Sequence, residues 1–335
     1  MSRRAAAGLL AATAVILSAC ASPAGERTSG GASSGVSVTS CGQRLTFAKT
    51  PARAVTLDQS ATETLLALGL AGRMAGTAFR KAEISPPYRA DYGKVPVLSA
   101  KMLTAEGLRA ANPDVAVASF TAMFTKDRVG TREELRGIGL PTYVSAVDCP
   151  KDGPAGATPF DLLFRDYRNY GHIFGVSDRA NRLVAEQRKV LDEAARLRRN
   201  LKGSPSVAYV YSVFNGTPYV AGKGGIPSEI SRLTGVRNVF DDVGEQWPQV
   251  TWEAVAQRRP DVIVLGDLTT AASPAGNTAA QKLATMRAHP TLSRLPAVRD
   301  NRTITVTAIE MDPGVRSVNV LRALVDGVRR FGHAD

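Results

Sequence analysis

This 335-residue sequence has few residues of the kinds that metal sites need. Its histidines are His172, His289 and His333, and their scattered positions match no metal-ligand spacing. His289 precedes Pro290 and is most simply a loop residue. We therefore expect no metal ion bound directly by the protein and no resident cofactor.

The motifs of common catalytic centres are missing as well. The chain contains no Gly-x-Ser-x-Gly elbow, no His-Glu-x-x-His and no Cys-x-x-Cys. Residues 222–225, Gly-Lys-Gly-Gly, resemble a phosphate-binding loop, but the first glycine of that motif and its final Ser or Thr are absent. A turn is the simpler interpretation. We expect no enzyme activity, although an exported enzyme remains the main competing class, with an adhesion lipoprotein as a third.

Runs of basic residues interleaved with aromatics are also lacking, which argues against nucleic-acid binding. The formal net charge is nevertheless +12, and removal of Arg3 and Arg4 with a signal lowers it to about +10. Such a charge favours anionic ligands or contact with anionic lipid. It could equally reflect a composition rich in arginine.

The sequence has one notable apolar stretch, at the N-terminus, and it is short. Arg3 and Arg4 precede the uncharged residues 5–19, a pattern typical of a secretory signal and too short for a confident spanning helix. The run ends Leu-Ser-Ala-Cys20, which resembles the bacterial lipoprotein processing box. There, cleavage precedes the cysteine and its thiol receives a lipid. The alternative is a chance cysteine at an ordinary cleavage site.

Cysteine is scarce, with three in the chain. If Cys20 is lipidated, Cys41 and Cys149 remain as a pair. In an oxidising compartment a disulfide between them is the natural expectation, although two buried thiols are the alternative. Residues after Cys20 are rich in Ala, Ser, Pro, Gly and Thr and predict a flexible tether.

The rest of the chain divides into two similar α/β halves around a helical stretch. In the first half, strands are predicted at residues 54–57, 74–78, 115–119 and 142–146, with helices between them. In the second half they are predicted at 207–211, 262–265 and 303–307, and a last helix spans 315–331. This alternation predicts mainly parallel sheets with helices on their faces.

Between the halves, apolar residues recur at three-four spacing over 178–201, and a shorter helix is predicted at 160–174. The longer helix predicts a rod of about 33 Å, roughly the width of a small domain. Its position indicates a strut joining two lobes, although an ordinary surface helix would show the same periodicity.

One unit is repeated in the two halves. Glu106 is followed seven positions later by Pro113-Asp114 and a strand, and Glu253 is followed seven positions later by Pro260-Asp261 and a strand. Each unit predicts a helix, a turn and a buried strand. Chance could produce the two units, but a glutamate at the same place in each is harder to explain.

These segments resemble the substrate-binding lipoproteins of ABC importers for iron-siderophores and cobalamin, which form the helical-backbone class of periplasmic binding proteins. The resemblance covers the chain from about Arg53 to its end. It is carried by residues 54–69, Glu106, residues 112–115, residues 247–250 (Trp-Pro-Gln-Val), Glu253 and residues 259–264. It implies two Rossmann-like lobes bridged by one long helix, with a ligand held between them and little hinge motion.

The resemblance also implies a docking role for two residues. In the family, one surface glutamate per lobe pairs with arginines of the permease dimer, and Glu106 and Glu253 occupy those positions. The simpler alternative is that both are solvated carboxylates favoured by the helix dipole.

In such folds ligands lie beyond the carboxyl ends of the strands. Aromatic and arginine side chains there would suit a bulky, partly apolar, anionic chelate. The phenylalanines could instead be core residues and the arginines surface charges. The candidate ligand-binding residues are Asp58, Gln59, Arg80, Phe120, Tyr211, Trp247, Glu310 and Arg316.

The predicted organisation is therefore a signal peptide at 1–19, a lipidated Cys20 and tether at 20–40, a first lobe at 41–159, connecting helices at 160–203 and a second lobe at 204–335. We expect an exported monomer, held by lipid at the outer face of the cytoplasmic membrane, that gives a ferric siderophore to an ABC permease. Cobalamin, haem or a metal-free organic cofactor is the alternative ligand, and any iron would arrive inside its chelator.

Overall fold

The structure is a computed structural model that describes residues 35–270 and 275–335. The predicted signal peptide, Cys20 and most of the predicted tether lie outside the described residues. The end of the predicted tether does not: residues 36–40 form strand β1 (Val36–Ser40), which pairs antiparallel with β2 (Gln43–Phe47). Alternate residues of both strands are buried against the first lobe, so this hairpin is part of the folded protein.

The first lobe is built on a parallel five-stranded sheet with strand order β5-β4-β3-β6-β7. Side chains of β6 alternate between two separate apolar clusters: Val115 and Val117 point to one, Ala116 and Ala118 to the other. Both faces are therefore covered, as expected for a parallel sheet. The elements are β3 (Ala54–Thr56), β4 (Met74–Ala78), β5 (Val97–Ser99), β6 (Val115–Ala118), β7 (Thr142–Val144), α1 (Gln59–Ala67), α2 (Arg89–Tyr92), α3 (Ala105–Ala110) and α4 (Arg132–Gly137).

The second lobe has a mixed five-stranded sheet. Strands β10-β8-β11-β12 are parallel, and β9 pairs antiparallel with the far part of β8. The alternation is the same, because Val207 and Tyr209 face one cluster and Ala208 and Val210 the other. The elements are β8 (Ser206–Phe214), β9 (Thr217–Val220), β10 (Arg237–Asn238), β11 (Val262–Asp267), β12 (Thr303–Thr307), α7 (Ile226–Thr234), α8 (Trp252–Arg258), α9 (Ala279–Ala288), α10 (Pro296–Arg299) and α11 (Ser317–Arg330).

Two antiparallel helices connect the lobes. Helix α5 (Pro159–Phe174) ends at Gly175 in the left-handed conformation, and α6 (Ser177–Leu197) returns along it. They approach closely at Gly171, where a Cβ would lie 2.8 Å from that of Ala180. The predicted helix over 178–201 ends at Leu197, four residues earlier than expected, and continues only as a 3-10 turn over Arg198–Asn200.

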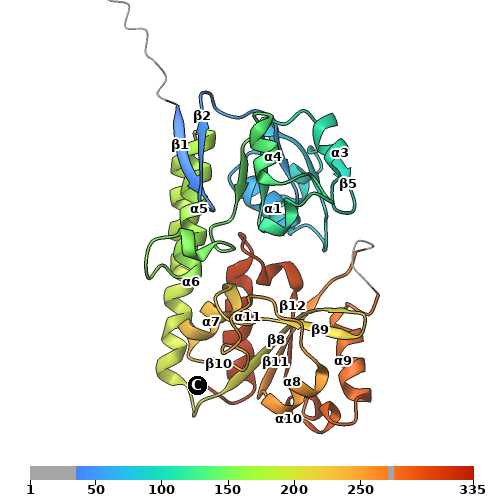
Figure 1. Ribbon diagram of the computed structural model, residues 1–335. Helices are drawn as coiled ribbons and strands as arrows, with labels where there is room; N and C mark the ends of the chain where they lie inside the picture. The colour runs from blue at the N-terminus through green and yellow to red at the C-terminus, as the bar shows by residue number, and fades with distance from the viewer. Residues whose placement is uncertain (1–34, 271–274) are drawn as a thin grey trace, which may run out of the picture. The chain divides into compact units, whose positions relative to one another are not determined.

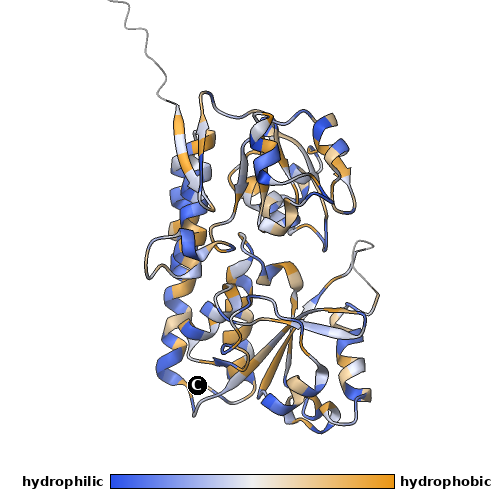
Figure 2. Ribbon diagram, viewed as in Figure 1, coloured by the Kyte–Doolittle hydropathy of each residue, from blue (hydrophilic) through white to orange (hydrophobic). Residues whose placement is uncertain are grey.

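Helix α6 spans both lobes, as predicted. Ala180 belongs to the core of the first lobe, whereas Val184 and Leu197 belong to the core shared with the second. Hydrogen bonds repeat this division: Arg179 donates to the carbonyl of Leu68 at 2.9 Å, and Gln187 donates to the carbonyl of Val315 at 2.9 Å. Figures 1 and 2 show α6 alongside both sheets, with apolar and polar residues alternating along it.

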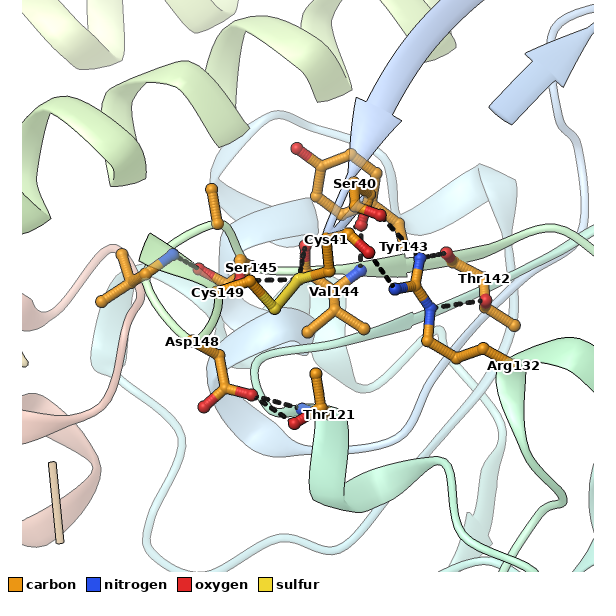
Figure 3. Close-up of a disulfide and its surroundings, with 12 residues drawn as sticks. Ser40, Cys41, Thr121, Arg132, Thr142, Tyr143, Val144, Ser145, Asp148 and Cys149 are labelled. Carbon is orange, nitrogen blue, oxygen red and sulfur yellow. Dashed lines mark hydrogen bonds between the residues drawn. A yellow bond between two sulfur atoms is a disulfide. The ribbon is translucent and has the colours of Figure 1, made fainter. Parts of the chain in front are cut away.

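The predicted pairing of Cys41 and Cys149 is confirmed by a disulfide between residues 108 positions apart (Figure 3). It ties the β1–β2 turn to the segment that precedes α5. Arg132 supports the same junction, donating to the carbonyls of Ser40 at 2.8 Å and Thr142 at 3.0 Å. A disulfide that closes a loop of this length stabilises a fold by roughly 2–4 kcal/mol.

The repeated unit is visible in the structure. Thr104 and Thr251 cap α3 and α8, so that Glu106 and Glu253 each lie in a first helical turn. The aspartate after each proline has the same role in both lobes, since it accepts hydrogen bonds from the backbone just before or at the start of a central strand. Asp114 accepts from the amides of Ala52 at 2.7 Å and Arg53 at 3.0 Å, and Asp261 accepts from the amide of Ser206 at 2.8 Å.

A buried lysine organises the strand ends of the second lobe. Lys282 of α9 has no exposed surface and donates to the carbonyls of Tyr211, Gly266 and Asn277, at 2.7 Å for Tyr211 and 2.9 Å for Asn277. These carbonyls lie at the ends of β8 and β11 and in the following loop. Burial lowers the pKa of Lys282 to about 8, although the carboxylate of Asp267 opposes this.

Replacement of this lysine tests its structural role. Lys282→Met leaves three buried carbonyls without their donor and should lower the free energy of unfolding by about 2–3 kcal/mol in urea titrations. Lys189→Met, on the exposed face of α6, is the matched control and should change it by less than about 0.5 kcal/mol.

The two proteins should also differ in pH dependence. The folded-state pKa of about 8 lies below the value of about 10.4 for an unfolded lysine, so the unfolded chain binds the proton more tightly. Stability of the wild type should therefore rise from pH 8 to about 10.4 relative to Lys282→Met. Parallel stability curves for the two proteins over this range would contradict the assignment.

Candidate functional site

The candidate site is a cavity of about 230 Å³ with walls from both lobes. The first lobe contributes Lys81, which follows β4, and Phe120, which follows β6. The second lobe contributes side chains from β8, β9 and the segments after β10 and β12, namely Tyr211, Ser212, Tyr219, Trp247 and Asp312. Most of these positions are at or beyond the carboxyl ends of parallel strands, where α/β folds bind ligands.

A larger hollow of about 1270 Å³ lies elsewhere. It runs along the edge strand β12 between α9 and α11, and is lined by residues such as Leu283, Ile304 and Phe331. All its lining residues belong to the second lobe, and the first lobe contributes none. We therefore take the smaller cavity between the lobes as the candidate site.

An ion pair crosses this cavity from one lobe to the other. The ammonium of Lys81 lies 2.8 Å from the carboxylate of Asp312, and the two side chains are 13% and 3% exposed. Lys81 also donates to the hydroxyl of Tyr211, which in turn donates to Asp312 at 3.0 Å. Lobe contact here is thus made by a buried, hydrogen-bonded charge pair.

Burial and the opposite charge determine the protonation of this triad. Burial alone would lower the pKa of Lys81, but Asp312 and Tyr211 outweigh it and raise the pKa above its ordinary value. Burial raises the pKa of Tyr211, and it raises that of Asp312 against the opposing effect of Lys81. Lys81 therefore remains a cation, and Tyr211 a neutral hydroxyl, at physiological pH.

Aromatic rings form the apolar part of the cavity wall. The rings of Tyr211 and Trp247 lie 4.8 Å apart between centroids and are tilted by 59°. Tyr211 lies where the pairing of β8 with β9 shifts register, between Val210 and Ser212. Its carbonyl is one of the three that accept hydrogen bonds from Lys282, and this bond fixes the backbone that carries the ring. Phe120 completes the aromatic wall from the first lobe.

A second inter-lobe contact involves Arg316, which the sequence analysis assigned to ligand binding. Its guanidinium lies 2.9 Å from Glu310 and 3.5 Å from Glu63 of the first lobe. It also donates to the carbonyl of Glu83 at 3.1 Å. Arg316 and Glu310 do not line the cavity, and both are used to join the lobes behind it. Burial raises the pKa of Glu63, and Arg316 opposes this shift.

Two further predicted ligand residues are buried inside the first lobe. Asp58 caps α1 through the amide of Ala61 at 2.9 Å and accepts from the amide of Ser119 at 2.6 Å. Gln59 accepts from the amides of Lys81 and Ala82, both at 2.9 Å. Neither side chain reaches the cavity. Gln59 acts indirectly, because it holds the loop that presents Lys81.

Arg80 lies beside the site in a separate cavity of about 420 Å³. It is partly exposed and pairs with Glu83 at 3.3 Å. Of the eight predicted ligand residues, the structure therefore brings Phe120, Tyr211 and Trp247 together in the inter-lobe cavity. Their role in binding, and that of the other five, stays a prediction.

The sequence analysis missed the two charged residues of the cavity. Lys81 directly follows Arg80 in the loop after β4. The strand-end rule that selected Arg80 could therefore have selected Lys81 as well. Phe79 in that loop has φ of +54°, a conformation uncommon outside glycine and frequent at functional sites. Asp312 follows Glu310 by two positions, but nothing in the sequence shows that it opposes a lysine 231 residues away.

The two predicted docking glutamates are at the surface. Glu106 is exposed in the first turn of α3. Glu253 is 62% exposed in the first turn of α8 and lies 3.1 Å from Nε2 of His289. Hydrogen bonds from its own backbone amide and from His289 lower the pKa of Glu253. The structure thus leaves both carboxylates accessible.

Among residues 35–270 and 275–335, no cluster of three or more His, Cys, Asp or Glu side chains could hold a metal ion. None of the helices in these segments is both long enough and apolar enough to cross a membrane. The cavity instead offers one buried ion pair, several hydroxyl groups and an aromatic wall contributed by both lobes.

Comparison with known proteins identifies the family. Residues 55–309 match the model of the family described as periplasmic binding protein. A periplasmic binding protein from Veillonella parvula dsm 2008 is 31% identical, with 88% of this chain and 97% of that chain covered and a TM-score of 0.72. The comparison with curated proteins gave no match.

Two further solved structures are similar. One, from Saccharomonospora viridis DSM 43017, is described as an ABC-type Fe3+-hydroxamate transport system; it is 25% identical, with 87% and 98% covered and a TM-score of 0.72. A periplasmic heme binding protein from Pseudomonas aeruginosa is 22% identical, with 85% and 94% covered and a TM-score of 0.65, and shows a shared fold. The family match over more than half of the chain shows that this protein belongs to the periplasmic binding protein family.

Proposed function

We propose that this protein captures a ferric siderophore between its two lobes and delivers it to an ABC importer. The observation that carries the proposal is the inter-lobe cavity, which is lined by Phe120 of the first lobe and by the paired rings of Tyr211 and Trp247 of the second. Aromatic faces pack well on the organic shell of a chelate. The similarity to the Fe3+-hydroxamate transport protein of Saccharomonospora viridis supports this ligand class.

The proposed role is binding rather than catalysis, because the family consists of binding proteins. Iron would enter and leave as part of the bound chelate. A cavity of about 230 Å³ is smaller than the ~300–1,000 Å³ typical of drug-sized ligands. A bulky chelate would therefore extend from it toward the neighbouring cavity that contains Arg80, or separate the lobes slightly.

We also propose export and anchoring by lipid at Cys20, on the outer face of the cytoplasmic membrane. The family name places such proteins outside the cytoplasm, and the disulfide between Cys41 and Cys149 suits an oxidising compartment. The lipid itself is supported by the sequence around Cys20, which resembles the lipoprotein processing box.

Docking on the permease is assigned to Glu106 and Glu253. Each is an exposed carboxylate in the first turn of a helix, in equivalent units of the two lobes. Two like charges on separate lobes could be recognised by two symmetry-related permease subunits. Charges at the rim of an interface contribute mainly to encounter and orientation.

Ligand binding is tested first by fluorescence. Trp247 lines the cavity, so a bound ferric chelate should quench its emission, whereas Trp252 is buried in α8 of the second lobe. The panel is a ferric trishydroxamate, a ferric triscatecholate, ferric citrate, haemin and cobalamin, each beside its metal-free form where one exists. We expect saturable quenching by an iron chelate that is lost in Trp247→Phe and kept in Trp252→Phe.

If neither the ferric siderophores nor ferric citrate quenches the fluorescence, and calorimetry also detects no binding, the siderophore proposal is contradicted. Quenching by cobalamin or haemin alone would change the identity of the proposed ligand and would keep the proposed role in binding. Both outcomes can be told apart from loss of folding by circular dichroism of the same samples.

Docking is tested by uptake. Glu106→Gln with Glu253→Gln should leave the Kd for the chelate unchanged, since neither residue lines the cavity. The double variant should lower uptake of the iron-labelled chelate by cells about tenfold, through slower encounter with the permease. Glu133→Gln with Glu193→Gln, exposed on α4 and α6, is the control of equal charge. Equal uptake by the two double variants would contradict the docking role.

A further inference from the structure

The charges that line the inter-lobe cavity cancel. They are the ammonium of Lys81 and the carboxylate of Asp312, which lie 2.8 Å apart and are 13% and 3% exposed. Lys81 contacts a carboxylate of the opposite lobe from inside the cavity itself. A ligand entering here meets a closed ion pair, and the field of the cation is already compensated.

The next cation behind the cavity is compensated as well. Arg316 lies 2.9 Å from Glu310 and 3.5 Å from Glu63, and it donates to Thr307 Oγ1 at 2.8 Å. Its side chain is 12% exposed, so it has little surface to offer a ligand. One guanidinium is thus shared by two carboxylates, and this group adds no positive charge to the site.

The neighbouring cavity, which contains Arg80, carries one excess positive charge. It contains Arg80 and Glu83, which pair at 3.3 Å, together with Arg89. The single excess positive charge of Arg89 is exposed at the surface, where solvent and salt screen it. It can guide an anion toward the cleft more easily than it can compensate one that is buried there.

The remaining wall is aromatic and hydroxyl-bearing. Tyr211, Trp247 and Phe120 offer ring faces, and the hydroxyl of Tyr211 is already used between Lys81 and Asp312. Such a wall stabilises an apolar, uncharged shell. A buried negative charge would meet a lysine whose charge Asp312 already compensates, and it would lose its hydration without gaining a free cationic partner.

Iron chelates differ sharply in the charge they would bring. Three hydroxamates, each a monoanion, cancel the charge of Fe³⁺, whereas three catecholates, each a dianion, leave a large negative excess. Haemin and ferric citrate carry free carboxylates. We propose that this site selects charge-neutral ferric trishydroxamates over anionic iron chelates. The inference rests on the proposed function, because it names the ligand class for the same cavity.

The test compares two chelates of similar size and different charge. Equilibrium dissociation constants are measured by Trp247 quenching and by calorimetry at low salt, for ferrioxamine E, a neutral ferric trishydroxamate, and for ferric enterobactin, a triscatecholate. Haemin is the third arm. We expect the wild type to bind ferrioxamine E at least tenfold more tightly than either of the others.

Two substitutions should move this ratio in opposite directions. Asp312→Asn leaves the charge of Lys81 uncompensated and should shift the preference at least tenfold toward the triscatecholate. Lys81→Met leaves the carboxylate and should shift it further toward the trishydroxamate. Asp242→Asn is the control of equal charge: Asp242 is 63% exposed and pairs with Arg258 on the surface of the second lobe. This variant should leave the ratio unchanged.

The outcomes separate this inference from the proposed function. Equal or tighter binding of ferric enterobactin by the wild type would overturn the inference and keep the siderophore proposal. The same holds if Asp312→Asn and Asp242→Asn change the ratio equally. If none of the three iron compounds binds, the proposed function fails and the inference fails with it. Because the wild-type ratio is itself decisive, the test does not depend on either variant folding.

Discussion

The packing of α6 into two separate cores is the constraint on which the rest of the structure depends. Ala180 is buried in the first lobe, and Val184, Val190 and Leu197 are buried in the core shared with the second. Because one continuous helix belongs to both, the lobes cannot move apart freely without bending it or exposing apolar surface. Helix α5 and the disulfide between Cys41 and Cys149 reinforce the same junction. The cleft therefore has a defined width, and the side chains that face across it have defined partners.

Those partners explain the chemistry of the cleft. At its centre Lys81 meets Asp312, and behind it Arg316 meets Glu63, so each lobe supplies one cation and at least one carboxylate to the other. Buried pairs of this kind contribute little net stability but specify geometry, because an unpaired charge in the same place would be costly. Among the described residues that line the cavity, the walls are aromatic and the charges of Lys81 and Asp312 balance. Under our proposal, the aromatic walls and the balanced charge favour a neutral ligand over an anionic one.

The main fold could be predicted from the sequence because its signals are local. Strand and helix periodicity and the Pro-Asp turns placed the parallel sheets and the central helix. The hairpin β1–β2 and the antiparallel β9 were missed, since short strands that pair with neighbours carry weak patterns. In the site, Phe120 and Tyr211 were reached by the strand-end rule, and Trp247 was reached as part of the segment before Glu253. The structural roles of Asp58 and Arg316 were not predicted, and the pairing of Lys81 with Asp312 was not predicted either. These contacts join segments that are distant in the sequence, so they arise only when the chain is folded.

The most direct test of this account is the position of the iron in a complex. Crystals of the protein with ferrioxamine E, measured at the iron absorption edge, would give one anomalous peak for each bound chelate. The account predicts a peak between the lobes, beside Tyr211 and Trp247 and close to Phe120. A peak in the larger hollow along β12, or at any position contacted by one lobe alone, would contradict the claim that the two lobes together form the binding site.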